Sequence, residues 1–333
     1  PAEAVLDTAA DDFVLPFTVE GLDVRGRVVR LGPAIDAILA RHDYPEPVSA
    51  LLAEAAALAV LLGSSLKVDG RFIMQTQTDG PVGLMVVDFE MPDKIRACAT
   101  YDADRVAEVA RSEATTGETI GALLGIGHLA MTIDAGPNTN RYQGVVPLDG
   151  GSLEDVAHTY FLQSEQIPTV VRLAAARAFR GGTDHDRAYH WRAGGIIVQH
   201  LPASETGRVP DLPPGDIPEG ADLPDFEEPD EWTEARVILE TVEDHELIDP
   251  SISAGNLLIR LYHERGVRVF DPTDVVERCR CSQDRITEML EGFPPEDQAH
   301  MVKDGEIVVT CEFCSTRYHV DPAKLGIKPD SGD

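Results

Sequence analysis

Two short cysteine pairs near the end of the chain constrain its fold more than any other feature. Cys279 and Cys281 are separated by 29 residues from Cys311 and Cys314. Two close pairs on separate loops can converge as a tetrahedral shell of four thiolates, and Zn²⁺ is the usual ion in such a shell. The second pair lies between two strand-like runs, which predicts a hairpin turn whose amides hydrogen-bond the sulfurs. The sequence therefore predicts one zinc ion held by these four cysteines.

The residues leave open whether this zinc is a structural staple or a redox switch. As a staple, it would hold together a segment of about 55 residues that is too small to be very stable on its own core. The switch interpretation follows from the spacing, because each pair brings two sulfurs close enough for a disulfide, with some strain in Cys-x-Cys. Oxidants attack thiolates, so oxidation of either pair would release the ion. Zinc binding contributes ~10–16 kcal/mol in small domains, and its loss would unfold the segment.

Charge limits the partners of the chain. Its 333 residues suffice for about two domains at roughly 150 residues each. They include 28 basic and 58 acidic residues, a formal net charge of −30. Affinity for nucleic acid rises with the number of phosphates that Lys and Arg neutralise, so this charge argues against nucleic acid and anionic membranes as partners. It also argues against a zinc-ribbon module for nucleic acid.

The sequence indicates no membrane span and no secretory signal. The longest apolar stretch, residues 50–62, contains Glu54 and is shorter than the ~20 residues that cross a bilayer. The first twelve residues carry four acids and no basic residue, unlike the basic start of a secretory signal. We therefore expect a cytoplasmic protein. In that reducing compartment, clustered cysteines favour metal binding or redox chemistry over structural disulfides.

The first two hundred residues predict an α+β domain with antiparallel strands. The long apolar helix expected at residues 46–66 has Ala and Leu on nearly every face, which is typical of a core helix. Short strands gathered around a few helices, without a regular βαβ alternation, favour an α+β domain over a doubly wound sheet. Strands are expected at 22–31, 72–78, 83–88, 95–100, 128–134, 142–148 and 195–200, and further helices at 33–41, 105–111 and 152–164.

Composition also divides the chain into parts. Residues 202–231 contain seven prolines, ten acids and one basic residue, which predicts a mobile linker or a long surface loop. Trp232, Ala235, Leu239 and Val242 then share one helical face. The expected division is an N-terminal mixed α/β core domain at 1–201, the acidic proline-rich segment at 202–231, a helical linker at 232–270, a small zinc domain at 271–325 and a tail at 326–333.

Residues outside the cysteine pairs have simpler interpretations. His300 and His319 could ligate zinc, but four cysteines already complete the shell. Cys98 lies in a strand pattern between two alanines, which predicts a small buried apolar residue.

The sequence contains no HExxH motif, nucleophile elbow or phosphate loop. We therefore expect a protein that is not an enzyme. One enzymatic alternative is a thiol–disulfide oxidoreductase that uses Cys311 and Cys314. That chemistry favours a first cysteine at a helix N-terminus, where its pKa falls, so the hairpin context argues against it.

Further motifs accompany the cysteine pairs. Those near the pairs are Tyr262-His263-Glu264, Asp271-Pro272, Cys279-Arg280-Cys281-Ser282, Asp304-Gly305-Glu306-Ile307, Cys311-Glu312-Phe313-Cys314 and Tyr318. Those in the first domain are His42-Asp43-Tyr44-Pro45, Leu66-Lys67-Val68-Asp69-Gly70, Asp79-Gly80-Pro81, Arg141-Tyr142-Gln143-Gly144-Val145-Val146 and Ser164-Glu165-Gln166. Together they closely resemble the redox-regulated 33-kDa heat-shock chaperones, also called 33 kDa chaperonins. The resemblance covers nearly the whole chain.

This resemblance implies a cytoplasmic, ATP-independent holdase of the stress response that is reduced, zinc-bound and inactive at rest. In that family oxidation joins the first two cysteines and the last two, which here implies disulfides Cys279–Cys281 and Cys311–Cys314. Zinc then leaves, and the small domain and the adjoining linker unfold. The active protein binds unfolding client proteins, often as a homodimer.

The helical linker contains the candidate client-binding residues. While the linker is folded, its apolar cluster is expected to be a helix face packed on the first domain, and release would expose it. Its members are Leu257, Leu258, Leu261 and Tyr262. The chain departs from the family in the acidic proline-rich segment at 202–231, which is longer than the expected connector.

Overall fold

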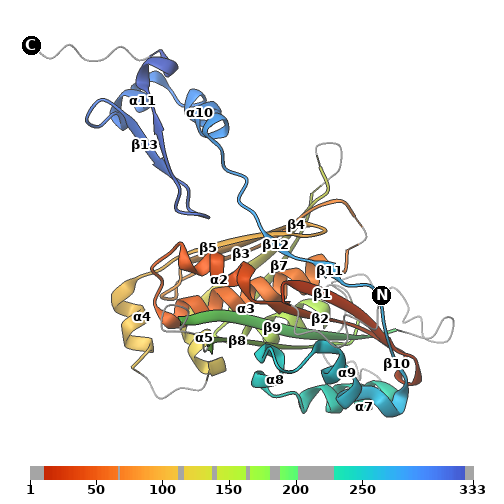
Figure 1. Ribbon diagram of the computed structural model, residues 1–333. Coiled ribbons are helices and arrows are strands. Elements are labelled where there is room, and N and C mark those ends of the chain that lie inside the picture. The colour runs from red at the N-terminus through yellow and green to blue at the C-terminus, as the bar shows by residue number, and fades with distance from the viewer. Residues whose placement is uncertain are drawn as a thin grey trace, which may run out of the picture.

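One apolar helix, α3 (Glu46–Gly63), lies at the centre of the fold, between two six-stranded sheets (Figure 1). The computed structural model describes residues 11–66, 68–111, 116–136, 141–162, 166–180, 188–201 and 229–326. By length and apolar composition α3 could cross a membrane, but 83% of that stretch is buried inside the folded chain. This burial is expected of a core helix, and it agrees with the prediction for residues 46–66.

The two sheets have simple topologies. The first has the strand order β10-β1-β2-β9-β8, and β11 also pairs with β1. Its strands are β1 (Phe13–Val19), β2 (Val24–Leu31), β8 (Thr169–Arg180), β9 (Ala188–His200), β10 (Val267–Val269) and β11 (Thr273–Asp274). The second has the order β12-β5-β4-β3-β6-β7. Its strands are β3 (Gly70–Thr78), β4 (Leu84–Met91), β5 (Lys94–Thr100), β6 (Ile126–Asp134), β7 (Tyr142–Asp149) and β12 (Val276–Glu277).

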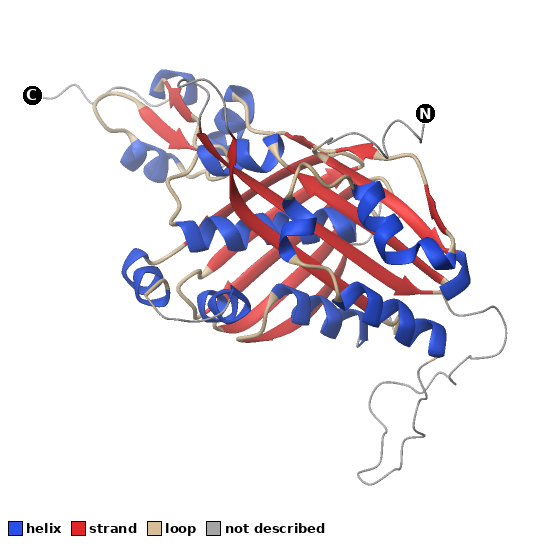
Figure 2. Cartoon of the chain, turned by 60° about the horizontal axis from the view of Figure 1, so that its bottom comes forward, coloured by secondary structure: helices blue, strands red, loops and turns tan. Residues whose placement is uncertain are grey.

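The antiparallel α+β architecture expected from the sequence is confirmed, since β12 with β5 is the one parallel pair among these described strands. Figure 2 shows helices lying across the long strands. Among its described residues the N-terminal body also contains four shorter α-helices, namely α2 (Pro33–Ala40), α4 (Ala103–Val109), α5 (Thr116–Leu124) and α6 (Leu153–Tyr160).

Sequence patterns missed three elements of this body. Strand β1 is buried at most of its positions, so it lacks the alternation of polar and apolar residues that marks a half-exposed strand. Strand β8 is rich in alanine, which disfavours strands, but it pairs along its whole length with β9. That pairing also extends β9 upstream of the predicted residues 195–200. Helix α5 was missed too.

The helical linker covers the outer face of the first sheet. It comprises α7 (Asp230–Glu240), α8 (Asp244–Ile248) and α9 (Ala254–Tyr262), which lie beneath β8 and β9 in Figure 1. The approach is close, since a Cβ atom on Gly194 would lie 2.0 Å from the Leu247 carbonyl oxygen. Buried Arg30 fixes the end of α8 by donating hydrogen bonds of 2.8–2.9 Å to the carbonyls of Glu246, Asp249 and Ile252.

The chain then crosses from the first sheet to the second. Residues 271–278, grouped with the zinc domain in the expected division, form β11 and β12 and pair with β1 and β5. Beyond them a small C-terminal unit, residues 279–326, extends away from the N-terminal body (Figure 1). It contains α10 (Gln283–Glu291), α11 (Pro295–Met301), β13 (Ile307–Thr310), β14 (Arg317–Val320) and the short helix η4 (Pro322–Leu325).

The C-terminal unit has very little apolar core. Its buried cluster consists of Leu290, Ile307 and Val320, with a few partly buried neighbours. Three buried side chains stabilise a unit of this size only weakly, because burying each contributes about 1.5–3 kcal/mol. The acidic proline-rich segment predicted at 202–231 lies outside the described residues, except for 229–231 at the start of α7. Most of the tail predicted at 326–333 also lies outside them.

Glu54 makes the stability of the body depend on pH. It is 6% exposed in the middle of α3, and burial, helped by Glu154 and Asp244, raises its pKa to about 8. Unfolding returns this pKa to near 4.5, so between pH 4.5 and 8 the folded chain binds a proton that the unfolded chain has lost. Stability from this group therefore falls as pH rises through that window.

Replacing Glu54 with glutamine should remove this penalty. We expect Glu54→Gln to match the wild-type thermal midpoint near pH 4.5 and to be the more stable protein at pH 8, by roughly 4 kcal/mol. Thermal unfolding followed by circular dichroism at both pH values measures the difference. An advantage of equal size at both pH values would contradict the assignment.

Candidate metal centre

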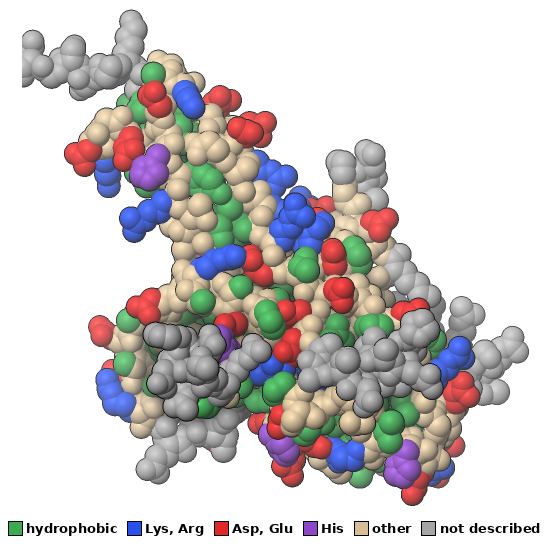
Figure 3. Space-filling model, in the orientation of Figure 1, with side chains coloured by type: hydrophobic (Ala, Val, Ile, Leu, Met, Phe, Trp, Pro, Cys, Tyr) green, Lys and Arg blue, Asp and Glu red, His purple; other side chains and the backbone are tan. Residues whose placement is uncertain are grey.

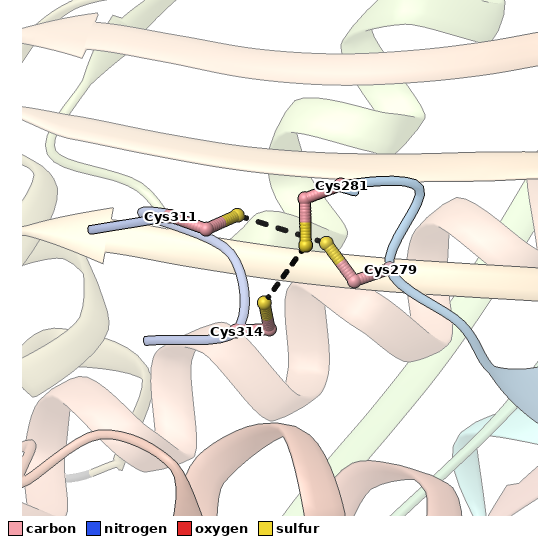
Figure 4. Close-up of side chains that lie close together, drawn as sticks. All are labelled: Cys279, Cys281, Cys311 and Cys314. Atoms are coloured by element: carbon pink, nitrogen blue, oxygen red, sulfur yellow. Dashed lines mark hydrogen bonds between the residues drawn. The ribbon is translucent and has the colours of Figure 1, made fainter. Parts of the chain in front are cut away.

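The four clustered cysteines converge on one point. Their sulfur atoms all lie within 4.8 Å of one another, and all four thiols are free. Cys279 and Cys311 are 3.7 Å apart between sulfurs, and Cys281 and Cys314 are 3.2 Å apart. Figure 4 shows the sulfurs pointing toward one another from two separate loops. A tetrahedral zinc with Zn–S bonds of ~2.3 Å spaces its sulfurs by ~3.8 Å, so the cluster fits a four-thiolate metal site.

Local structure places each pair. Cys279 and Cys281 lie on the extended stretch between β12 and α10. Helix α10 begins after Ser282, whose hydroxyl accepts a hydrogen bond from the Arg285 amide. Cys311 and Cys314 lie in the turn between β13 and β14, as predicted. We call these the Cys-x-Cys loop, residues 279–281, and the Cys-x-x-Cys loop, residues 311–314.

Hydrogen bonds and burial shift the pKa values of Cys281, Cys311 and Cys314 differently. Burial raises the pKa of Cys281 to about 12, although the Tyr318 hydroxyl donates a hydrogen bond of 3.0 Å to its sulfur. Burial also raises the pKa of Cys311, against the effect of the amides of Phe313 and Cys314. At Cys314 burial acts the same way, but hydrogen bonds with Thr316 and the neighbouring thiols outweigh it and lower the pKa to about 7. The amide contacts match the expected knuckle.

The Cys-x-Cys loop is anchored to the second sheet through a buried carboxylate. Arg280, between the two cysteines, donates a hydrogen bond of 2.6 Å to Asp88 on β4. Arg96 on β5 donates one of 2.7 Å to the same oxygen. Asp88 is only 4% exposed. Burial lowers the pKa of Arg96, but hydrogen bonds with Asp88 and with the Cys279 sulfur more than offset this and raise it.

The Cys-x-x-Cys loop is anchored to the N-terminal body through Arg96 and His42. Phe313, between the two cysteines, lies over the Arg96 guanidinium with 3.9 Å between its ring centre and the guanidinium carbon. The two ring nitrogens of His42 approach the Phe313 carbonyl oxygen at 3.3 Å and the Ser315 hydroxyl at 3.2 Å. The His42 ring itself stacks on Tyr44, with 4.6 Å between ring centres. Both loops thus contact the N-terminal body.

Comparison with known proteins agrees with this architecture. The family model described as Hsp33 protein matches residues 12–321. A 33 kDa chaperonin of Caulobacter vibrioides strain NA1000 / CB15N is 46% identical over 313 residues, which cover 94% of this chain and 95% of the relative. One of Pseudomonas putida strain KT2440 is 34% identical over 323 residues, covering 96% and 94%. This chain belongs to the Hsp33 family.

The fold also matches a solved Hsp33 structure. The crystal structure of the 33 kDa chaperonin of Thermotoga maritima superposes with a TM-score of 0.72. The match covers 95% of this chain and 97% of that one at 19% identity, so it shows a shared fold. The resemblance seen in the sequence motifs is thereby confirmed. The Hsp33 family is one of heat-shock chaperones and not of enzymes.

Within this Hsp33 fold the other candidate residues lie apart from the sulfur cluster. Among the described residues neither His300 nor His319 belongs to the metal-binding group, and His319 instead hydrogen-bonds Glu306 at 2.9 Å. Cys311 follows strand β13 and no helix begins at it, so the helix N-terminus that an oxidoreductase favours is lacking there.

Two further findings concern residues judged from sequence alone. Cys98 is buried on β5, two residues after Arg96 and therefore on the same face of the sheet. Burial, and after it the negative charge of Glu312, raise the pKa of the Cys98 thiol to about 12. The candidate client-binding residues Leu257, Leu258, Leu261 and Tyr262 are each at most 7% exposed and pack against the first sheet. Sequence reasoning missed the roles of Asp88 and Arg96. No local pattern in the sequence marks either residue, because their burial depends on the fold.

Proposed function

We propose that this chain is a redox-regulated, ATP-independent holdase of the cytoplasm that binds unfolding proteins under oxidative stress. The observation that carries the proposal is the cluster of four free sulfurs on two short loops, beside a unit with almost no apolar core. Membership of a heat-shock chaperone family supports the holdase activity. At rest the chain would be reduced, inactive and loaded with one zinc ion held by the four cysteines.

Oxidation would be the trigger. Two molecules of peroxide accept four electrons from the four thiolates, and with four protons they become four water molecules, while two S–S bonds form. By family resemblance the disulfides join Cys279 to Cys281 and Cys311 to Cys314. A disulfide sulfur is a poor ligand, so the zinc ion would leave with both disulfides formed.

Loss of zinc would convert a folded segment into binding surface. The C-terminal unit would unfold because its apolar cluster of three buried side chains cannot replace the metal. The linker would loosen next, since residues 263–278 connect α9 directly to the cysteine loops. The buried face formed by Leu257, Leu258, Leu261 and Tyr262 would then be exposed to clients. The active form would include homodimers, as family resemblance implies.

The test measures zinc and chaperone activity together. We expect the reduced protein to bind one zinc per chain and to release it on treatment with peroxide and mild heat. The oxidised protein, and not the reduced one, should then suppress light scattering by a thermally unfolding client without ATP. Cys98→Ser is the matched control and should behave as wild type. Zinc retained after all four thiols are consumed, or efficient turnover of a small disulfide substrate, would contradict the proposal.

A further inference from the structure

Both cysteine loops insert the residue between their cysteines into one place on the N-terminal body. Arg280 reaches Asp88, and Phe313 lies over Arg96. Asp88 and Arg96 stand opposite each other on the neighbouring strands β4 and β5, so their side chains share one face of the second sheet. Figure 3 shows Lys and Arg side chains gathered where the C-terminal unit meets the body.

The centre of this place is a buried carboxylate surrounded by arginines. The same oxygen of Asp88 accepts hydrogen bonds from Arg96 and Arg280 at 2.7 and 2.6 Å, and Arg71 approaches it to 3.9 Å. With Asp88 only 4% exposed, solvent screens these pairs poorly. Removing one member of such a group leaves a buried charge without its partner, which weakens the whole arrangement.

The aromatic contact adds a second point of attachment. Arg96 is positioned by Asp88 on one side and covers the Phe313 ring on the other, at 3.9 Å from its centre. His42 then holds the backbone and side chain that flank this ring, at Phe313 and Ser315. Arg96 and His42 of the body therefore hold the Phe313 ring, the Phe313 carbonyl oxygen and the hydroxyl of Ser315, the residue that follows the Cys-x-x-Cys loop.

We propose that Asp88, Arg96 and His42 form a docking site that holds both cysteine loops on the N-terminal body and thereby sets how readily oxidants release the metal. The inference rests on the proposed function, because it names residues that regulate the same centre. These are positioning residues, since they act through the loops and do not ligate the ion.

Two physical effects predict that docking slows the release of zinc. A disulfide needs its sulfurs ~2.05 Å apart, so loops held by the residue between their cysteines must be freed before the sulfurs in each pair can approach. A divalent ion with four thiolates also carries two net negative charges, which the guanidinium group of Arg96 beside the Cys279 sulfur stabilises. Undocking removes both effects. Variants that cannot dock should therefore lose zinc faster and at lower peroxide concentrations.

The experiment is a double-mutant cycle across the contact between Arg96 and Phe313, made in the full-length, reduced, zinc-loaded chain. Zinc release after a fixed dose of peroxide is followed with a chromogenic chelator. We expect Arg96→Gln and Phe313→Leu each to speed release about three- to tenfold. The double variant should release zinc no faster than the faster single variant, because both changes remove one contact.

Controls separate the possible causes. Arg141→Gln removes an exposed arginine that pairs with Asp134 on the same sheet, and it should release zinc at the wild-type rate. Phe313→Leu leaves the body unaltered, so a faster release by that variant cannot come from misfolding of the sheet. Circular dichroism checks that the body of Arg96→Gln unfolds at the wild-type temperature.

The outcomes distinguish the inference from the function beneath it. Single variants that release zinc at the wild-type rate, or rate increases that multiply in the double variant, would overturn the docking site. If instead the wild-type chain keeps its zinc under peroxide, the proposed function is wrong and the docking site regulates nothing.

Discussion

Removing the metal from the reduced chain should unfold residues 279–326 and leave the N-terminal body folded. The buried apolar cluster of the C-terminal unit consists of only Leu290, Ile307 and Val320, whereas a structural zinc contributes ~10–16 kcal/mol in small domains. The body, by contrast, has two extensive apolar clusters around α3 and under the linker. We therefore expect a strong chelator to unfold one end of the molecule selectively.

Hydrogen exchange measured by mass spectrometry resolves the two parts. Amides in α10, β13 and β14 should exchange at nearly the rate of an unfolded chain after chelation, while those in α3 remain protected. Replacing Cys311 and Cys314 by serine should give the same pattern without a chelator, and Cys98→Ser should not. Protection of β13 and β14 in a chain shown by metal analysis to be metal-free would refute the expectation.

The second large effect is expected at Tyr262, the largest fully buried side chain of the linker. It packs against the first sheet, stacks at 6.2 Å on Phe17 and donates a hydrogen bond of 3.3 Å to the Ala235 carbonyl. Tyr262→Ala should cost ~3–5 kcal/mol, comparable to the truncation of other large core side chains. A linker of three short helices cannot absorb such a loss and should detach from the sheet.

If the linker detaches from the first sheet, we expect chaperone activity without oxidation. Reduced, zinc-loaded Tyr262→Ala should suppress aggregation of a thermally unfolding client in the absence of peroxide, whereas the reduced wild type should not. Ile259→Ala is the matched control, because Ile259 lies on the same helix but is 50% exposed. If the variant stays inactive although protease digestion shows an open linker, this helix face does not bind clients.

Some of this molecule could be predicted from local sequence and some could not. Helix α3 could be predicted because its run of Ala and Leu is typical of a helix that is buried on all sides, whichever elements surround it. The cysteine loops could be paired because thiolate chemistry limits what four clustered cysteines do. Strand β8 could not be found, because its alanines become a strand only through pairing with β9.

The docking site shows the same limit more clearly. Asp88 and Arg280 are 192 positions apart, and His42 and Phe313 are 271 apart. No local pattern relates such residues, since their contact depends on how residues 263–278 carry the chain from one sheet to the other. Arginine and aspartate on strands look like ordinary surface residues until the fold buries them together.

The strands that carry this crossing also protect the body. β10 and β11 cover the outer side of β1, and β12 covers the outer side of β5. If residues 267–277 lift away, each sheet acquires a new edge whose backbone amides and carbonyls lack partners. Such an edge accepts any extended polypeptide, because backbone pairing does not read side chains. A chaperone that opened in this way would gain a means of holding clients that share no sequence.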